Sequence, residues 1–448
     1  MTYDINIDFN LKKGKIKPIH AVNNQPVQGM MGTWDISNYY RQMAIPYSRL
    51  HETDGPYGCD QLVDIHCVFP NFDADENLPE SYNFWSTDIC LKGIIEAGGK
   101  PFYRLGESID HTPNPLYIHP PKDAGKWARI CEHIIRHYNE GWANGFYYGI
   151  EYWEIWNEPE GKNHNMWTGT WEQYFELYSV TANHLKKCFG DTIKVGGFAA
   201  TNTNYLFVEE LTERHKYCRD FTYAFFKYIT DEKTKAPLDF FSYHRYLNDP
   251  RDLYEYNNGT RAWLDSMGFK EAEIILDEWH NGYFKGHYER HSLQVSAETG
   301  IALIAGQKSL VDMMMYYDLR RTTLFNCLVS MEKAPLADFF PFEMFGKLYK
   351  LGTEVESGAF DEKSPVAVCA ATNGKKAGVM ICNMEKEHIN TEITINFKGV
   401  EKFDSMKFYK MHSDTSPCFP TLFADKTPEK EFKVNLGPCQ SIAFIEFE

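Results

Sequence analysis

Two glutamates each end a short apolar run that has the composition of a buried β-strand. The first run, Trp153–Glu158, stops at Pro159, because proline has no amide hydrogen to donate to a neighbouring strand. The second run, Ile275–Trp279, carries Glu278 near its end. Paired carboxylates about 5 to 5.5 Å apart serve retaining glycoside hydrolysis, and pairs about 6.5 to 9.5 Å apart serve the inverting reaction. The two strand ends therefore predict a pair of catalytic carboxyl groups, Glu158 and Glu278.

Strands that alternate with helices must position these two glutamates. Eight short apolar runs bounded by turn residues predict strands over Pro18–Val22, Tyr47–His51, Pro101–Leu105, Tyr152–Asn157, Ile193–Phe198, Leu238–Tyr246, Glu273–Trp279 and Asp312–Asp318. The stretches between them are long enough for helices, and Trp127–Tyr138 and Trp171–Cys188 have helical periodicity. Eight strand–helix units predict an α/β fold, the (β/α)8 TIM barrel. Strands four and seven face each other across the barrel mouth, so Glu158 and Glu278 can share one cavity.

The chain after Phe360 has a different pattern. Short alternating segments such as Val366–Ala371 and Ser441–Phe447 are separated by turns and show no helical period. They predict an accessory antiparallel β-sandwich. The segment Tyr3–Phe9 alternates in the same way and is free to pair with that sheet. We therefore divide the chain into a β-sandwich strand at 1–15, a catalytic barrel at 16–350 and a C-terminal β-sandwich at 351–448.

Composition and charge argue against several classes of partner. The 46 Lys and Arg residues against 62 Asp and Glu make the formal net charge −16, which disfavours nucleic acid and anionic membrane surfaces as partners. No segment approaches the roughly 18 apolar residues of a membrane span. Met1–Asn10 lacks the basic and apolar regions of a signal peptide, and the 11 Cys include no C-x-x-C pair. We expect a cytoplasmic protein and leave open whether it forms a homo-oligomer.

Histidine spacing does not predict a metal site. His133 and His137, and His287 and His291, have the i, i+4 spacing of helical metal ligands, but neither pair carries the H-E-x-x-H glutamate. We interpret them as surface histidines. A metal-dependent hydrolase built on a barrel would need a His-x-His pair in its first strand, and Pro18–Val22 has one histidine. We expect no metal and no other cofactor.

Aromatic residues make up 15% of the chain, and two interpretations of them stay open. Aromatic rings fill apolar cores, and they also form the apolar platforms on which sugars stack. Seven of them lie at predicted strand ends or in the loops beyond and are candidates for the wall of a sugar site: Trp167, Trp171, Tyr243, Trp279, Tyr283, Tyr316 and Tyr317. Met313–Met315, inside the eighth strand, is better explained as barrel filling.

Four short motifs resemble those of a known family. Trp156–Pro159 (WNEP) and Glu278-Trp279 resemble the acid/base and nucleophile motifs of the large clan of retaining glycosidases with barrel folds. Together with Tyr47–His51 (YSRLH) and Ser242–Tyr246 (SYHRY), they resemble glycoside hydrolase family 39, which includes β-xylosidases and α-L-iduronidases. The resemblance covers essentially the whole chain, although the β-sandwich matches in architecture rather than in motif.

The resemblance implies a role for each matching residue. Glu158 would be the general acid/base and Glu278 the nucleophile, and Asn157 would bind the hydroxyl next to the anomeric carbon. Arg49 and His51 would line the floor of the sugar site, with His244 contacting the sugar and Tyr246 the nucleophile. Apart from the resemblance, the position of Trp279, Tyr317 and Arg104 at the barrel mouth makes them further substrate-binding candidates. We expect the charge of Arg49 to lower the pKa of Glu278, whose charge would in turn keep Glu158 protonated.

The expected reaction is retaining, exo-acting hydrolysis of a terminal pentose from an oligosaccharide, with β-D-xyloside and α-L-arabinoside as leading substrates. The sequence departs from the xylosidase pattern at Asp277–His280, where Thr-Glu-Trp-Asn is expected, and in the more polar Phe102–Glu107. A hexose or uronate substrate and an inactive carbohydrate-binding barrel are the alternatives. Positive charge near the mouth would come from Arg104, His111, Arg245, Arg320 and Arg321. These residues would either pair with carboxylates such as Glu107 and Asp318, which we favour, or bind a uronate.

Overall fold

The computed structural model describes the chain except for residues 1, 30–31, 54–60, 111, 162–165, 282–291, 322, 324, 388 and 413–418. His111, Tyr283, His287 and His291, which were named among the candidates, lie outside the described residues.

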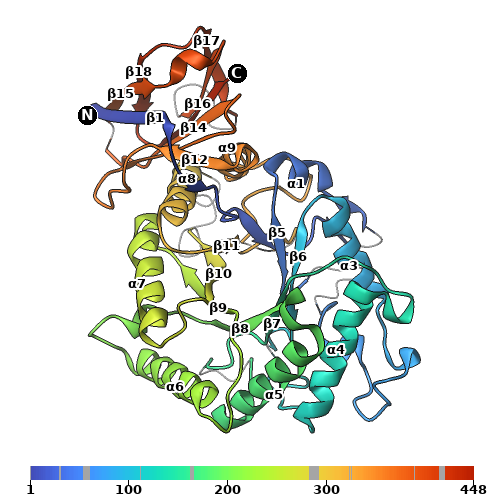
Figure 1. The fold of residues 1–448 in the computed structure, drawn as a ribbon. Coiled ribbons are helices and arrows are strands. Elements are labelled where there is room, and N and C mark those ends of the chain that lie inside the picture. The colour runs from blue at the N-terminus through green and yellow to red at the C-terminus, as the bar shows by residue number, and fades with distance from the viewer. Residues whose placement is uncertain are drawn as a thin grey trace.

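Eight parallel strands close into a barrel (Figure 1). In chain order they are β2 (Ala21–Asn23), β5 (Tyr47–Leu50), β6 (Lys100–Leu105), β7 (Tyr152–Ile155), β8 (Lys194–Ala200), β9 (Phe240–Tyr246), β10 (Glu273–His280) and β11 (Met313–Tyr316). Each strand pairs with the next, and β11 pairs with β2 to close the ring. All eight predicted barrel strands are found, so the predicted TIM barrel is confirmed, and the two glutamates follow or lie on its fourth and seventh strands.

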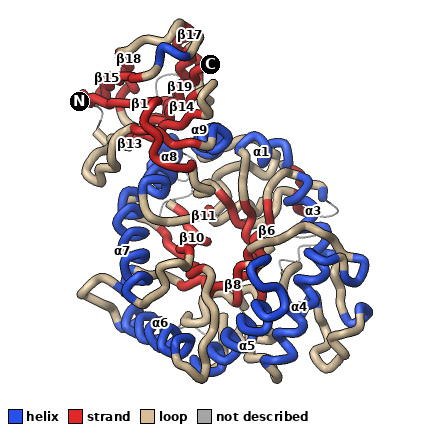
Figure 2. The backbone as a smooth tube through the Cα atoms, viewed as in Figure 1, coloured by secondary structure: helices blue, strands red, loops and turns tan. Residues whose placement is uncertain are grey.

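A helix follows each barrel strand and packs outside it (Figure 2). These helices are α1 (Ser37–Met43), α3 (Trp85–Glu96), α4 (Ala124–Glu140), α5 (Trp171–Phe189), α6 (Glu213–Thr230), α7 (Leu253–Ser266), α8 (Leu293–Lys308) and α9 (Phe339–Leu351), while the short α2 (Ile65–Val68) lies in the loop after β5. Local capping sets their ends. The Asp123 side chain accepts a hydrogen bond from the Lys126 amide at the start of α4, and Thr170 and Gln173 form a capping box at the start of α5.

Aromatic and sulfur-containing side chains fill the N-terminal half of the barrel interior. Tyr47, Phe102, Tyr152 and Phe240 pack ring against ring there, with centroid separations such as 5.2 Å between Phe102 and Tyr152. Met313 and Met315 lie in the same cluster, which confirms their interpretation as barrel filling. Part of the aromatic surplus is therefore a packed plug that closes the barrel below its polar C-terminal half.

A nine-stranded sheet forms the second unit of the molecule. Its order is β17-β16-β19-β14-β13-β12-β1-β15-β18. The strands are β1 (Thr2–Lys15), β12 (Thr353–Glu356), β13 (Val366–Thr372), β14 (Ala377–Asn383), β15 (Asn390–Lys398), β16 (Met406–His412), β17 (Thr421–Lys426), β18 (Glu431–Pro438) and β19 (Ser441–Phe447). All neighbours are antiparallel except β1 and β15. The predicted fold class is confirmed with one refinement, since hydrogen bonds join the strands into a single sheet.

Both faces of the central strands β14 and β19 are buried. Alternate residues of β14 and β19, such as Cys382 and Phe444, pack toward α8 and α9 on the barrel. A Cβ atom on Gly300 of α8 would lie 2.3 Å from the Cys382 sulfur, so only glycine permits this approach. On the other face the sheet curls around its own core, where Phe408 of β16 meets Phe432 of β18 at 5.4 Å.

The structure differs from the sequence predictions at two strands and one histidine. Strands β12 and β17 were not predicted, because β12 has only four residues and β17 is a largely exposed edge strand without an alternating pattern. The interpretation of His137 as a surface histidine is wrong, since its imidazole is buried, stacks on Phe84 at 3.6 Å and contacts the Asp88 carboxylate at 3.0 Å.

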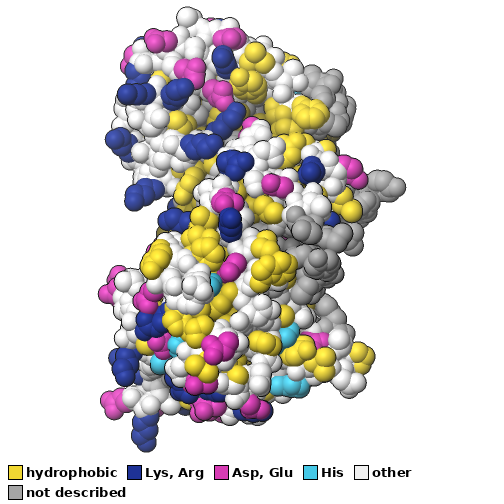
Figure 3. Space-filling model, turned by 90° about the vertical axis from the view of Figure 1, so that its right-hand side faces the viewer, with side chains coloured by type: hydrophobic (Ala, Val, Ile, Leu, Met, Phe, Trp, Pro, Cys, Tyr) yellow, Lys and Arg dark blue, Asp and Glu magenta, His cyan; other side chains and the backbone are white. Residues whose placement is uncertain are grey.

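Within the part of the chain that the structure describes, no helix is both long and apolar enough to span a membrane. On the face shown in Figure 3, acidic and basic side chains are interspersed over both the sheet and the barrel.

The N-terminal strand contributes an aromatic ring to the core of the sheet, which predicts an effect on stability. Phe9 of β1 is 1% exposed and packs against Phe397, Phe403 and Phe447. We expect Phe9→Ala to lower the free energy of unfolding by about 3–5 kcal/mol through the cavity it leaves. Leu11→Ala, on the same strand but 50% exposed, is the matched control and should change it little. Denaturant unfolding of both variants checks this, and equal effects would contradict the packing role of Phe9.

Candidate active site

A β-bulge on β10 turns two consecutive carboxylates toward the barrel interior. The pairing advances two residues on β10, from Leu276 to Glu278, while it advances one residue on β9. A bulge of this kind re-aims side chains beside functional sites. Asp277 and Glu278 consequently both contact the Arg49 guanidinium of β5, at 2.9 and 3.5 Å, from across the barrel.

The end of β7 presents the other glutamate through an unusual backbone. Trp156 and Glu158 have φ values of 74° and 46°, in the left-handed region that side chains other than glycine rarely adopt. Backbone hydrogen bonds to the segments on both sides keep the direction of the strand. The Trp156 amide donates to the Leu105 carbonyl oxygen (2.7 Å), and the Glu158 amide donates to the Phe198 carbonyl oxygen (3.1 Å). Gly106 of the loop after β6 makes room for the Trp156 ring, which a Cβ atom would meet at 2.9 Å. Such strain at a polar strand end is characteristic of functional sites.

Arg49 is the centre of the polar layer above the aromatic plug. Its guanidinium is fully buried and donates to Glu154 of β7 at 2.8 Å, in addition to its contacts with β10. It also donates to the side-chain oxygens of Asn157 and, at 3.2 Å, Asn23 of β2. The predicted site residue Arg49 therefore contacts Glu278 and orients Asn157, the neighbour of Glu158.

Glu154 and Asp277, which both contact Arg49, have pKa values shifted in opposite directions. Burial raises the pKa of Glu154 to about 8, and the Asp277 charge adds to this effect, although Arg49 opposes it. Burial alone would also raise the pKa of Asp277, but the charges of Arg49 and His244 outweigh it and lower that pKa. Glu154 therefore keeps its proton at neutral pH and directs it to Asp277, which carries the charge that balances Arg49.

His244 of β9 lies between the two predicted catalytic glutamates. Its Nδ1 is 2.7 Å from the Glu158 carboxylate, and its Nε2 is 3.7 Å from both Glu278 and Asp277. Burial opposes the charged imidazole, but the carboxylates around it raise the pKa of His244 well above its usual value. A protonated ring therefore joins the fourth strand to the seventh. The expected sugar contact of His244 stays a prediction, while Tyr246 donates a hydrogen bond to Glu278 as expected.

The two glutamates have different surroundings. The Glu158 side chain is 25% exposed and that of Glu278 is 9% exposed. Burial raises the pKa of Glu278 to about 7, with the nearby Glu158 adding to the effect. His244, Arg49 and the Tyr246 hydroxyl act in the opposite direction. The expectation that Arg49 lowers this pKa is correct in sign, but burial outweighs it.

Arg320 and the carboxylates beside it are paired with one another, whereas Arg245 lies over the Tyr256 ring. Arg320 contacts the carboxylates of Asp318 and Glu52 and donates to the Tyr317 hydroxyl at 2.7 Å. Tyr317 in turn donates to Glu52. The predicted pairing of Arg320 with Asp318 is confirmed.

Arg104 and His51 are buried at the same end of the barrel. Arg104 pairs with Asp64 at 2.6 Å and not with Glu107, which instead binds His66. His51 is 3% exposed, and burial together with the charges of Arg104 and Arg49 lowers its pKa well below the usual value. A neutral imidazole therefore lies among the cations, and Arg104, predicted to bind substrate, has a protein carboxylate as its partner.

The aromatic residues expected to form a sugar-binding wall are mostly inaccessible. Trp279 is fully buried and packs edge-on against Tyr316 at 5.4 Å. Tyr243 and Trp167 are also at most 2% exposed, and Tyr317 is 5% exposed, whereas Trp171 is partly exposed. Trp279, Tyr243 and Trp167 therefore pack within the protein, and contacts of Trp279 and Tyr317 with a sugar stay predictions.

Sequence reasoning missed Glu154, Asp277 and Glu52 as parts of the site. The signal for Glu154 was present, because a glutamate inside an apolar strand must be paired or neutral when buried. A bulge cannot be read from the sequence, and strict alternation along β10 would direct Asp277 and Glu278 to opposite faces. Glu52 follows His51 with a φ of 51°, which turns its side chain to Arg320.

One group of possible metal ligands lies near this mouth: Asp64, His66 and Glu107. Its oxygens already accept hydrogen bonds, because Arg104 and Ser108 donate to Asp64 and the His66 amide donates to Glu107. This group is explained as an internal ion-pair network.

The unequal protonation of Glu154 and Asp277 predicts different costs for two matched substitutions. Glu154→Gln replaces a neutral carboxyl by a neutral amide that can still donate to Asp277, and should change the free energy of unfolding by less than about 1 kcal/mol at pH 5. Asp277→Asn leaves the buried charge of Arg49 uncompensated and should cost about 3–5 kcal/mol. Denaturant unfolding measures both, and equal costs would contradict the assignment.

The same pair predicts a pH dependence. The raised pKa of Glu154 contributes stability that is present below the unfolded-state value of about 4.3 and is lost as pH rises through about 8. Glu154→Gln removes this loss, so the variant should gain stability relative to the wild type between pH 5 and pH 8. A difference that stays constant over this range would contradict a protonated Glu154.

Comparisons with known proteins agree with this geometry. The sequence model of glycosyl hydrolases family 39 matches residues 31–258, just over half of the chain. A β-xylosidase from Caldicellulosiruptor saccharolyticus is 24% identical over 362 residues, which cover 72% of this chain and 68% of that protein.

Solved structures share the whole architecture. A glucosidase from Croceicoccus marinus superposes with a TM-score of 0.78 at 18% identity, covering 100% of this chain and 99% of that one. A monomeric β-xylosidase from Caulobacter crescentus superposes with a TM-score of 0.68 at 15% identity, again over 100% and 99% of the two chains. The family match covers strands two to six of the barrel, including Arg49, Glu158 and His244, and we conclude that the chain belongs to glycoside hydrolase family 39 and is an O-glycoside hydrolase.

Proposed function

We propose that this family 39 enzyme is an exo-acting, retaining glycosidase that removes a terminal pentose from an oligosaccharide, with β-D-xyloside and α-L-arabinoside as leading substrates. The observation that carries the proposal is the arrangement of Glu158 and Glu278 on opposite nitrogens of His244, one more exposed and one buried. The β-xylosidase from Caldicellulosiruptor saccharolyticus, which is 24% identical to this chain over 362 residues, supports the choice of sugar.

In the first half of the proposed reaction, Glu278 attacks the anomeric carbon and Glu158 protonates the departing oxygen. The Tyr246 hydroxyl holds one oxygen of Glu278, and Arg49 lies 3.5 Å from the other. Both contacts favour the carboxylate form that the attack requires. His244 engages Oε1 of Glu158, which leaves Oε2 for the proton transfer.

In the second half, Glu158 acts as a base on water. The attacking water gives its proton to the Glu158 carboxylate, and its oxygen displaces Glu278 from the anomeric carbon. The 25% exposed side chain of Glu158 is accessible to that water. The same two groups therefore serve both half-reactions, as a retaining mechanism requires.

Asn157 is the proposed ligand of the hydroxyl next to the anomeric carbon. Its side-chain oxygen accepts from Arg49, which orients the amide and leaves the NH₂ group to donate to the sugar. A hydrogen bond that strengthens as the oxocarbenium ion develops contributes several kcal/mol at the transition state.

Pairing of the cations supports a neutral sugar over a uronate. Arg49, Arg104 and Arg320 each have carboxylate partners within the protein, so a substrate carboxylate that bound any of these three would have to displace that partner. A hexose is the second candidate, because the glucosidase from Croceicoccus marinus has a fold more similar to this one than the Caulobacter β-xylosidase does.

A panel of aryl β-D-xylosides, α-L-arabinosides and β-D-glucosides tests the substrate and the two roles together. Glu158→Ala should lower kcat/KM by roughly 10²–10⁴-fold for poor leaving groups and much less for dinitrophenyl glycosides, which need no proton. Glu278→Ala should abolish turnover of all of them. Glu151→Ala, just before the N-terminal end of β7, is the matched control and should retain wild-type rates.

Two results, one from that panel and one from NMR of the product, would change the proposal. A larger kcat/KM for the glucoside would replace the pentose by a hexose. Proton NMR of the first-formed sugar should show the anomer of the substrate, and the opposite anomer would remove Glu278 from the role of nucleophile.

The surroundings of Glu278 predict the pH profile. Its pKa of about 7 places the acidic limb of kcat/KM near pH 7, because activity requires the carboxylate and is lost as pH falls through that value. Tyr246→Phe removes a hydrogen bond that favours the carboxylate, so the limb should move to higher pH and kcat/KM should fall roughly 10–100-fold. A limb that stays in place would contradict the role of Tyr246.

A further inference from the structure

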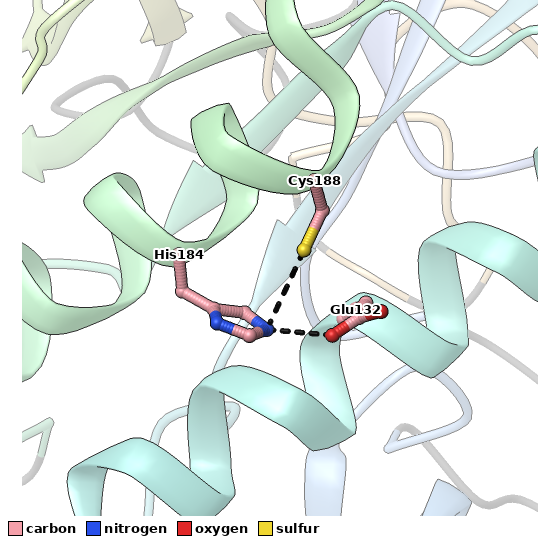
Figure 4. Close-up of side chains that lie close together, drawn as sticks. All are labelled: Glu132, His184 and Cys188. Atoms are coloured by element: carbon pink, nitrogen blue, oxygen red, sulfur yellow. Dashed lines mark hydrogen bonds and ion pairs between the residues drawn. The ribbon is translucent and has the colours of Figure 1, made fainter.

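A cluster of three different donor side chains bridges two outer helices of the barrel (Figure 4). Glu132 projects from α4, and His184 and Cys188, one turn apart on α5, face it from the same side of their helix. A carboxylate oxygen, an imidazole nitrogen and a thiol sulfur all lie within 4.8 Å of one another. None of these residues takes part in the polar layer around Arg49.

The donor set is selective for one class of ion. Magnesium and calcium prefer oxygen ligands, whereas a combination of sulfur, nitrogen and oxygen suits zinc and cobalt. Three protein ligands leave a fourth tetrahedral position for water. The Glu132 and His184 side chains are 15% and 27% exposed, so an ion can enter from solvent.

The spacing of the donors is close to what a tetrahedral ion requires. His184 Nε2 is 2.6 Å from Glu132 Oε2 and 3.8 Å from Cys188 Sγ. Zinc bond lengths of about 2.0–2.3 Å imply separations of roughly 3.4 Å between nitrogen and oxygen and roughly 3.5 Å between nitrogen and sulfur. The sulfur needs a shift of a few tenths of an ångström and the carboxylate somewhat more, which side-chain rotation supplies.

A neighbouring residue holds the carboxylate in place. Arg136 donates to Oε1 of Glu132 at 2.8 Å, which leaves Oε2 directed at His184. The Arg136 charge is shared with Glu140 and lies over the Phe189 ring. Hydrogen bonds of this kind to a ligand's second oxygen are common around bound metals.

We propose that Glu132, His184 and Cys188 bind one zinc ion that ties α4 to α5. The bound ion would replace the proton of the Cys188 thiol and the direct contact between His184 and Glu132. Since α4 and α5 follow the third and fourth barrel strands, the ion would stabilise the side of the barrel that carries Glu158.

Cobalt titration of the metal-free, full-length chain tests this proposal, because a thiolate bound to cobalt(II) has its own charge-transfer absorption. We expect saturation at one equivalent, displacement by zinc, no displacement by excess magnesium and a higher melting temperature with the metal bound. Cys188→Ser should abolish the thiolate band and weaken binding at least tenfold, and Glu132→Gln should weaken binding with the band retained.

Cys67→Ser is the matched control, since Cys67 is another partly exposed thiol beside an imidazole, 3.3 Å from His66. This variant should keep the cobalt–thiolate band. The proposal is overturned if the wild type shows no such band, or if the band persists in Cys188→Ser or disappears in Cys67→Ser. Circular dichroism and glycosidase activity of metal-free Cys188→Ser establish that the variant is folded.

Discussion

The buried guanidinium of Arg49 is the interaction on which the catalytic end of the barrel depends. A permanent charge without water requires ionised and hydrogen-bonding partners, and Arg49 finds them on the first, fourth and seventh strands. Its partners Asp277 and Glu154 have no solvent exposure. Removal of any one of them leaves a buried group unpaired, so the strands that carry the two glutamates are held in register by electrostatics as well as by backbone hydrogen bonds.

This polar layer is confined by the apolar plug below it. The rings of Tyr47, Phe102, Tyr152 and Phe240 close the N-terminal half of the barrel. They therefore keep water away from the charged groups above them. Low polarity strengthens each contact among Arg49, His244 and the carboxylates, and the same burial raises the pKa of Glu278. The site therefore balances two opposing effects, and the charged hydrogen-bond donors around Glu278 offset only part of the cost of its burial.

Much of the fold could be predicted from local pattern. Eight apolar runs bounded by turn residues became the eight barrel strands, and the periodic segments Trp127–Tyr138 and Trp171–Cys188 lie within α4 and α5. Failures occurred where local pattern is weak, at the four-residue β12 and the exposed edge strand β17. The aromatic residues were ambiguous for a related reason, because a ring at a strand end has the same sequence signature whether it faces a cavity or, like Trp279, the core.

The sequence by itself determined the order of the strands, the two glutamates at the fourth and seventh, and the motifs around them, because these depend on residues adjacent in the chain. The tertiary structure alone decided the partners and protonation of the site. Asp277 faces the interior through a bulge, Glu154 keeps its proton, and His244 joins Glu158 to Glu278. Each of these depends on distances and burial among side chains from different strands, and no spacing along the chain encodes them.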